Sequence, residues 1–156
     1  MLDGEQLDRV IAFARSIGVE VHEGELARST RVPGVDIVSG CVQVDRAALQ
    51  GIGDFLHEVA HVALTQPADR PALEEWVTGT EAQEISALAW TWAAGQYLGL
   101  DPADVFHDAV ISGNGPTLRE NFSAGQYVGV PMLQRWGLTN AGGAPTYPRM
   151  DRWMRD

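Results

Sequence analysis

The sequence is poor in cysteine, in positive charge and in long apolar runs. Its single cysteine, Cys41, excludes an internal disulfide and lies in an apolar run that favours a small buried side chain over a nucleophile. The formal net charge of −10 argues against a nucleic-acid-binding surface, which needs clustered basic residues. No apolar run reaches the length of a membrane span, and residues 1–6 lack the pattern of a signal peptide. We therefore expect a cytoplasmic protein that binds neither nucleic acid nor membranes.

The most informative segment is the H-E-x-x-H motif formed by His57-Glu58-Val59-Ala60-His61. On a helix, residues four apart point to one face, so the two histidines can hold one Zn²⁺ between them. Glu58 projects beside the metal and can take a proton from a water that the metal activates. The motif predicts a zinc site with Glu58 as its general base.

The residues around the motif favour a buried helix. From Ile52 to Leu64, apolar residues recur at steps of three and four, no proline interrupts them, and Pro67 follows soon after. The apolar residues cover most of the circumference of this helix, which predicts that the histidines are presented from within a core. Two core histidines that bind no metal are the alternative interpretation.

A zinc site of this kind needs a third protein ligand and leaves the fourth position for water. The candidates are four glutamates that follow the motif, Glu74, Glu75, Glu81 and Glu84. The first two lie in a polar stretch that contains prolines, where we expect them to be solvated.

The other two glutamates belong to a helix predicted from Thr80 to about Leu100. Glu81 fits a capping box that begins at Thr78, in which it would bond back to the start of the helix. Glu84 has no such explanation, since it lies on the apolar stripe of the helix, where an unpaired carboxylate is costly. We favour Glu84 as the third ligand and keep Glu81 as the alternative.

Four segments resemble the ImmA/IrrE family of zinc metallopeptidases. Residues 54–64 resemble its FxxAHExGHxxL signature, with Leu56 and Ala60 in place of the usual Ala and Gly. Residues 84–89 resemble its EAxxFA helix, whose glutamate is the third zinc ligand, although Ile85 replaces the Ala. Residues 40–45 and 127–138 are similar to the strand before the zinc helix and to the family's VSxxAxxxRLxxLGL end. This resemblance, over roughly residues 40–140, implies a zinc peptidase with a peptide or protein substrate; the helix-turn-helix module of many relatives is not evident.

The patterning as a whole predicts an α+β fold, a mostly helical zincin-like domain with a small sheet packed beside the H-E-x-x-H helix. Its length and its 45% hydrophobic residues fit a single domain over residues 1–156, with 140–156 as a C-terminal tail. Trp153 and two methionines make us expect that this tail docks on apolar surface, and we favour its own chain over a partner. The further predicted elements are a helix over 7–17, a strand over 19–22, a hairpin within 35–44 and short helices over 102–111 and 118–124.

The function that these patterns favour is a zinc-dependent peptidase or hydrolase. The strand around residues 42–44 could offer an open edge to an extended peptide. An oxyanion stabiliser would help to polarise the scissile carbonyl, and His22, Tyr97, His107 and Tyr127 are residues of suitable type, but the sequence assigns this role to none of them. Two alternatives remain: a non-catalytic regulatory or protein-binding domain that keeps a zincin-like fold, and an interaction protein without metal.

Overall fold

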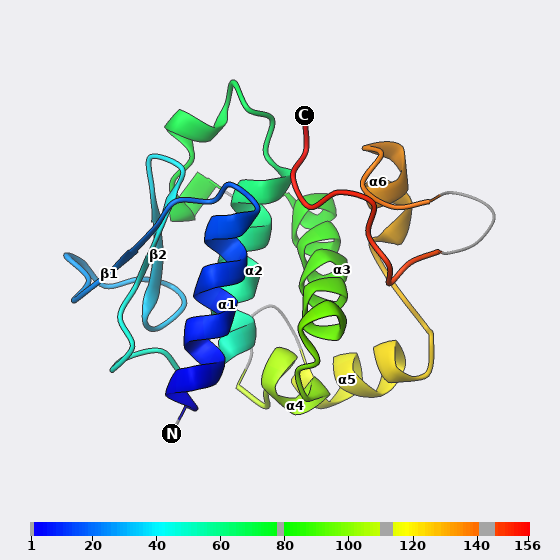
Figure 1. Cartoon of the computed structure of the whole chain (residues 1–156), viewed down its shortest axis with the longest axis horizontal. Coiled ribbons are helices and arrows are strands. Elements are labelled where there is room, and N and C mark those ends of the chain that lie inside the picture. The colour runs from blue at the N-terminus through cyan, green and yellow to red at the C-terminus, as the bar shows by residue number, and fades with distance from the viewer. Residues whose placement is uncertain (1, 78–79, 110–113, 141–145) are drawn as a thin grey trace.

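The computed structural model describes residues 2–77, 80–109, 114–140 and 146–156. Its fold is α+β, as predicted, with a three-stranded sheet packed beside helices (Figure 1). The helices are α1 (Gly4–Ser16), α2 (Ile52–Leu64), α3 (Glu81–Leu98), α4 (Pro102–Val105), α5 (Gly115–Ser123) and α6 (Val130–Arg135), and the strands are β1 (Val21–Glu23), β2 (Val35–Val38) and β3 (Cys41–Val44). Two short 3₁₀ turns, η1 (Arg70–Ala72) and η2 (Glu75–Val77), lie between α2 and α3. None of the helices described here is long and apolar enough to cross a membrane.

The sheet has the strand order β1-β3-β2. Strands β2 and β3 form the predicted hairpin, and its two turn residues, Ser39 and Gly40, both have positive φ angles, as a tight hairpin turn of the I′ type requires. Strand β1 pairs with β3 in parallel, in the register Val21 to Val42. The prediction that residues 42–44 offer an open edge is therefore wrong, because β3 is the central strand and is paired on both sides.

Helix α2 lies at the centre of the fold, between the sheet and α3, with α1 alongside it (Figure 1). All 13 residues of α2 are buried, including both histidines and the glutamate of the motif. The apolar circumference seen in the sequence thus corresponds to neighbours on every side of the helix. The fold places the motif inside the core.

Helix α2 also approaches α4 so closely that only a glycine fits at the contact. A Cβ atom built on Gly53 would lie 1.7 Å from the carbonyl oxygen of Val105. Gly53→Ala is therefore expected to push the two helices apart and to lower the free energy of unfolding by about 1–3 kcal/mol. Gly4→Ala, at a position with no atom within 4 Å of the added carbon, is the matched control. Thermal denaturation of both variants tests whether the helices touch at Gly53. Equal melting temperatures of Gly53→Ala and Gly4→Ala would refute this contact.

Two helical predictions differ from the structure. The helix expected over 102–111 ends at Val105, because Phe106 leaves the helical conformation to stack on the indole of Trp92, with ring centroids 5.7 Å apart. Residues 110–111 of that prediction lie outside the described residues. Helix α5 begins at Gly115, three residues earlier than expected, since the Asn114 side chain caps it by accepting a hydrogen bond from the Thr117 N–H.

The C-terminal tail packs on its own chain, as predicted. The Trp153 ring contacts those of Phe13 and Trp90, with centroids 5.1 Å and 5.4 Å away. The indole N–H of Trp90 donates a hydrogen bond to the Trp153 carbonyl oxygen at 2.9 Å. The backbone N–H of Arg155 donates to the Ala63 carbonyl oxygen at 2.9 Å, one of the carbonyls that the end of α2 leaves without a helical partner. The tail thus secures the end of the helix that carries the motif.

Candidate metal centre

Three side chains from two adjacent helices converge between α2 and α3. His57 and His61 lie one turn apart on α2, and their Nε2 atoms are 3.1 Å apart. Glu84, in the first turn of α3, directs both carboxylate oxygens at them. Its Oε2 lies 3.0 Å from Nε2 of His57, and its Oε1 lies 2.9 Å from Nε2 of His61. The packing of α3 on α2 therefore completes a triangle of three ligand-type groups.

The dimensions of this triangle suit a small divalent metal. Ligand atoms about 2.0–2.1 Å from a tetrahedral zinc ion lie roughly 3.3 Å from one another. The distance between the two Nε2 atoms, and the distance from each of them to the Glu84 oxygen that it contacts, are within a few tenths of an ångström of that spacing. Two imidazoles and one carboxylate are also the donor set of known catalytic zinc sites that keep a fourth position open. The residues present fit zinc in both chemistry and geometry.

The protonation of Glu84 suits a metal ligand. Burial raises the pKa of its carboxyl group, but the hydrogen bonds with His57 and His61 outweigh burial and hold the pKa below its usual value. Glu84 is therefore a carboxylate at neutral pH, as a ligand must be. Burial also lowers the pKa of His61, which favours the neutral imidazole that binds metal.

Of the two glutamates considered as third ligand, the structure brings Glu84 to the histidines. Glu81 is exposed at the first position of α3. The predicted capping box of Thr78 and Glu81 is wrong in its register, because Thr80 is the N-cap and Gln83 supplies the reciprocal hydrogen bond. Thr78 itself lies outside the described residues. Glu81 and Glu84 lie three residues apart on α3, and the packing of α3 on α2 brings Glu84 to the two histidines while Glu81 stays exposed.

Glu58 is the unusual group of the centre. Its side chain is fully buried, and a carboxylate oxygen lies within 4.8 Å of a ring nitrogen of each histidine. Neither of its oxygens accepts a hydrogen bond within the part of the chain that the structure describes. Burial raises the pKa of Glu58 to about 7, although the charges of His57 and Arg31 oppose the rise. A buried carboxylate without hydrogen bonds is costly in a core, and a group with a pKa near 7 can exchange a proton at neutral pH.

The four residues of a type that could stabilise an oxyanion make their described contacts away from this centre. His107 Nε2 lies 2.8 Å from Asp54 Oδ2 in the first turn of α2. His22 lies on the exposed face of the sheet, 2.8 Å from Glu20. The two tyrosines pack against other aromatic rings. Tyr97 contacts Phe13 and Trp153, and Tyr127 contacts Phe122 and Tyr147. The described contacts of these four residues place none of them beside the three ligand-type groups.

One residue beside the centre was missed in the sequence. Arg31, in the loop between β1 and β2, brings Nη2 to 3.7 Å from Glu84 Oε1. Its charge also acts on His61, whose pKa burial lowers and Arg31 lowers further. No spacing in the sequence predicts this contact, because Arg31 lies in a polar, turn-prone stretch far from the motif. Only the folded loop brings it to the site.

Comparison with family models, with curated proteins and with solved structures gave no match for this chain.

Proposed function

We propose that this chain is a zinc-dependent hydrolase that acts on peptide bonds, with His57, His61 and Glu84 as the metal ligands and Glu58 as the general base. The observation that carries the proposal is the convergence of the three ligand-type side chains beside a fully buried glutamate with no hydrogen bond from the described residues. A purely structural zinc site has four protein ligands and no need of such a carboxylate. The arrangement therefore favours catalysis over the non-catalytic alternative.

In this proposal each residue has a separate role. Zinc bound at the three ligands would supply Lewis acidity, which polarises a carbonyl group and lowers the pKa of water. The Glu58 carboxylate takes a proton from the attacking water as the water oxygen bonds to the carbonyl carbon. Glu58 then delivers that proton to the leaving amine nitrogen as the carbon–nitrogen bond breaks. Burial raises the pKa of Glu58 above the usual value of a glutamate, which favours its role as a proton acceptor.

The fold family, the substrate class and the cellular location of the chain are also proposed. A zincin-like fold and membership of the ImmA/IrrE family rest on the sequence resemblance around the motif, and the peptide substrate rests on that resemblance as well. A cytoplasmic location is part of the same proposal, since a single cysteine suits a reducing compartment.

The test of the proposed function is Glu58→Gln. The change removes the proton acceptor but no ligand, so the variant is expected to keep zinc and to hydrolyse peptides at least about 100-fold more slowly than the wild type. The measurement is cleavage of a mixture of internally quenched peptides by zinc-loaded protein, with the zinc content determined on the same samples.

Glu120→Gln, an exposed glutamate on α5, is the matched control and is expected to leave cleavage unchanged. Cleavage by Glu58→Gln at the wild-type rate would refute the role of Glu58. A zinc-loaded wild-type protein that cleaves no peptide in the mixture would favour the non-catalytic alternative.

A further inference from the structure

Arg31 lies at the solvent side of the candidate metal centre. The side chains of His57 and His61 are 8% and 4% exposed, that of Glu84 is 24% exposed and that of Arg31 is 49% exposed. Exposure thus rises from the histidines through Glu84 to Arg31. Of these four side chains, the Arg31 guanidinium is therefore the one most available to a molecule in solvent.

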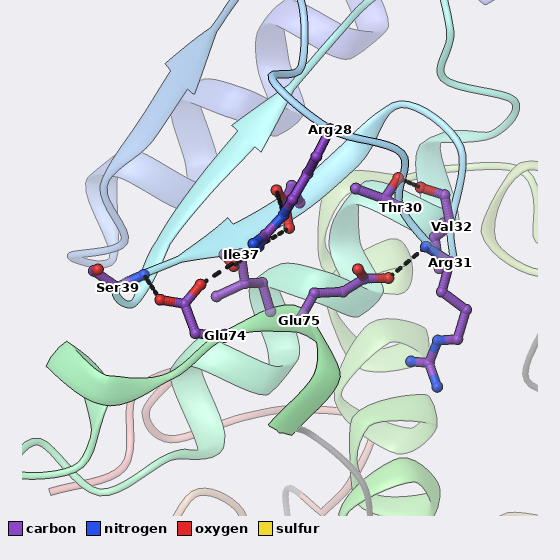
Figure 2. A network of polar contacts seen from close by, with 9 residues as sticks. Arg28, Thr30, Arg31, Val32, Ile37, Ser39, Glu74 and Glu75 are labelled. Atoms are coloured by element: carbon purple, nitrogen blue, oxygen red, sulfur yellow. Dashed lines mark hydrogen bonds and ion pairs between the residues drawn. The ribbon is translucent and has the colours of Figure 1, made fainter.

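The backbone at Arg31 is held by a buried carboxylate. Glu75, only 7% exposed, accepts a hydrogen bond from the Arg31 backbone N–H at 2.7 Å. Figure 2 shows Glu75 reaching that nitrogen while the Arg31 side chain extends away from the bond. The neighbouring Thr30 hydroxyl donates to the Val32 carbonyl oxygen at 2.6 Å and closes the turn. The position from which the guanidinium extends is therefore fixed.

A second contact fixes the same loop on its other side. The Arg28 guanidinium donates two hydrogen bonds to the carboxylate of Asp36 on β2, at 2.8 Å and 2.9 Å, and Asp36 is almost fully buried. Glu74 joins Arg28 to the hairpin turn, because its two oxygens accept from Arg28 and from the Ser39 N–H (Figure 2). A bidentate arginine–carboxylate pair is among the strongest and most directional polar contacts in proteins. These contacts hold the backbone of the loop from which the Arg31 side chain extends.

The Arg31 guanidinium forms a long ion pair with Glu84 and keeps hydrogen-bond donors available for another partner. Its Nη2 is 3.7 Å from Glu84 Oε1, which is an ion-pair distance but too long for a good hydrogen bond. A Glu84 carboxylate that binds a metal shares its negative charge with that metal, so its attraction for Arg31 weakens. A guanidinium has five N–H donors in a planar fork that matches a carboxylate, and half of this side chain faces solvent.

We propose that Arg31 is a substrate-binding residue that selects substrates with a carboxylate close to the scissile bond. The inference rests on the proposed zinc hydrolase function and names the class of its substrate. The half-exposed side chain of Arg31, next to the partly exposed Glu84, favours contact with a substituent of the substrate over contact with the reacting carbonyl oxygen, which must reach the buried ligands. An acidic side chain or a terminal carboxylate next to the cleaved bond would accept hydrogen bonds from the Arg31 guanidinium.

Binding of small hydroxamates to zinc-loaded protein tests this inference without a turnover assay. The probes are succinic and glutaric monohydroxamates, which carry a zinc-binding group and a carboxylate, and their neutral primary amides. The wild type is expected to bind at least one carboxylate probe about tenfold more tightly than its amide, as measured by calorimetry. Arg31→Gln is expected to keep zinc and lose this preference, and Arg31→Lys is expected to keep part of it. Arg15→Gln, which removes an arginine whose side chain is equally exposed on α1, is the matched control and should keep all of it.

Each other result overturns the inference. Equal affinities of the wild type for carboxylate and amide probes would show that Arg31 selects nothing, and so would a full preference in Arg31→Gln. Loss of zinc from Arg31→Gln would assign Arg31 to the support of Glu84 instead. If the wild type takes up no zinc, the proposed function itself fails, and the zinc content shows this before any probe is added.

Discussion

Glu84→Ala is expected to abolish tight zinc binding, whereas Glu81→Ala is expected to leave it unchanged. Glu84 contacts both histidines at 2.9–3.0 Å, while Glu81 is exposed in the same helical turn. Removal of a direct ligand should weaken zinc affinity by more than about 100-fold, because even changes in residues that support the ligands cost 10–100-fold. Competition with a chromophoric zinc chelator measures both affinities.

The two variants are matched in most other respects. Both remove one glutamate from the first turn of α3, so they change net charge and helix propensity equally. The capping box is intact in both, since it is formed by Thr80 and Gln83. Loss of zinc from Glu81→Ala with retention in Glu84→Ala would overturn the assignment of the third ligand.

Removal of the tail by ending the chain after Asn140 is expected to destabilise the fold strongly. The truncation removes Tyr147, which is 7% exposed and whose hydroxyl donates to the Ala89 carbonyl oxygen at 2.8 Å. It also removes the Trp153 ring from its contacts with Phe13 and Trp90. Since burial of a large apolar side chain contributes about 1.5–3 kcal/mol before entropy is subtracted, we expect a net loss on the order of 3 kcal/mol. The melting temperature should fall by roughly 10 °C, which calorimetry measures.

A single substitution separates the role of the docked ring from that of the rest of the tail. Trp153→Ala is expected to account for a large part of the loss, whereas Trp76→Ala is the matched control, because Trp76 is 68% exposed. Melting of the truncated chain at the wild-type temperature would contradict the packing of the tail.

The sequence predicted those features of the fold that depend on neighbouring residues. The apolar spacing from Ile52 to Leu64 gave the bounds of α2 correctly, because a helix buried on every side leaves that pattern. The hairpin was predicted because Gly40 lies between two strand-like runs. Glu84 was favoured because a carboxylate on an apolar stripe needs a partner, and the structure brings it to the two histidines.

The features that were missed depend on contacts between distant parts of the chain. The parallel pairing of β1 with β3 makes β3 central, and no periodicity within residues 42–44 carries that information. Helix α4 is short because Phe106 turns towards Trp92, a partner on another helix. Arg31 reaches Glu84 through a loop whose backbone is held by Glu75, and the prediction that Glu75 is solvated is wrong because its side chain is buried against this loop. Tertiary contacts of this kind override local pattern.

Quantification of zinc tests the central claim most directly. Protein purified without added metal is analysed for its zinc content, then supplied with zinc, freed of excess by gel filtration and analysed again. The arrangement of His57, His61 and Glu84 predicts about one zinc ion per chain in the second sample, together with a higher melting temperature, because bound metal stabilises the folded state. A zinc content near zero in both samples would contradict the account.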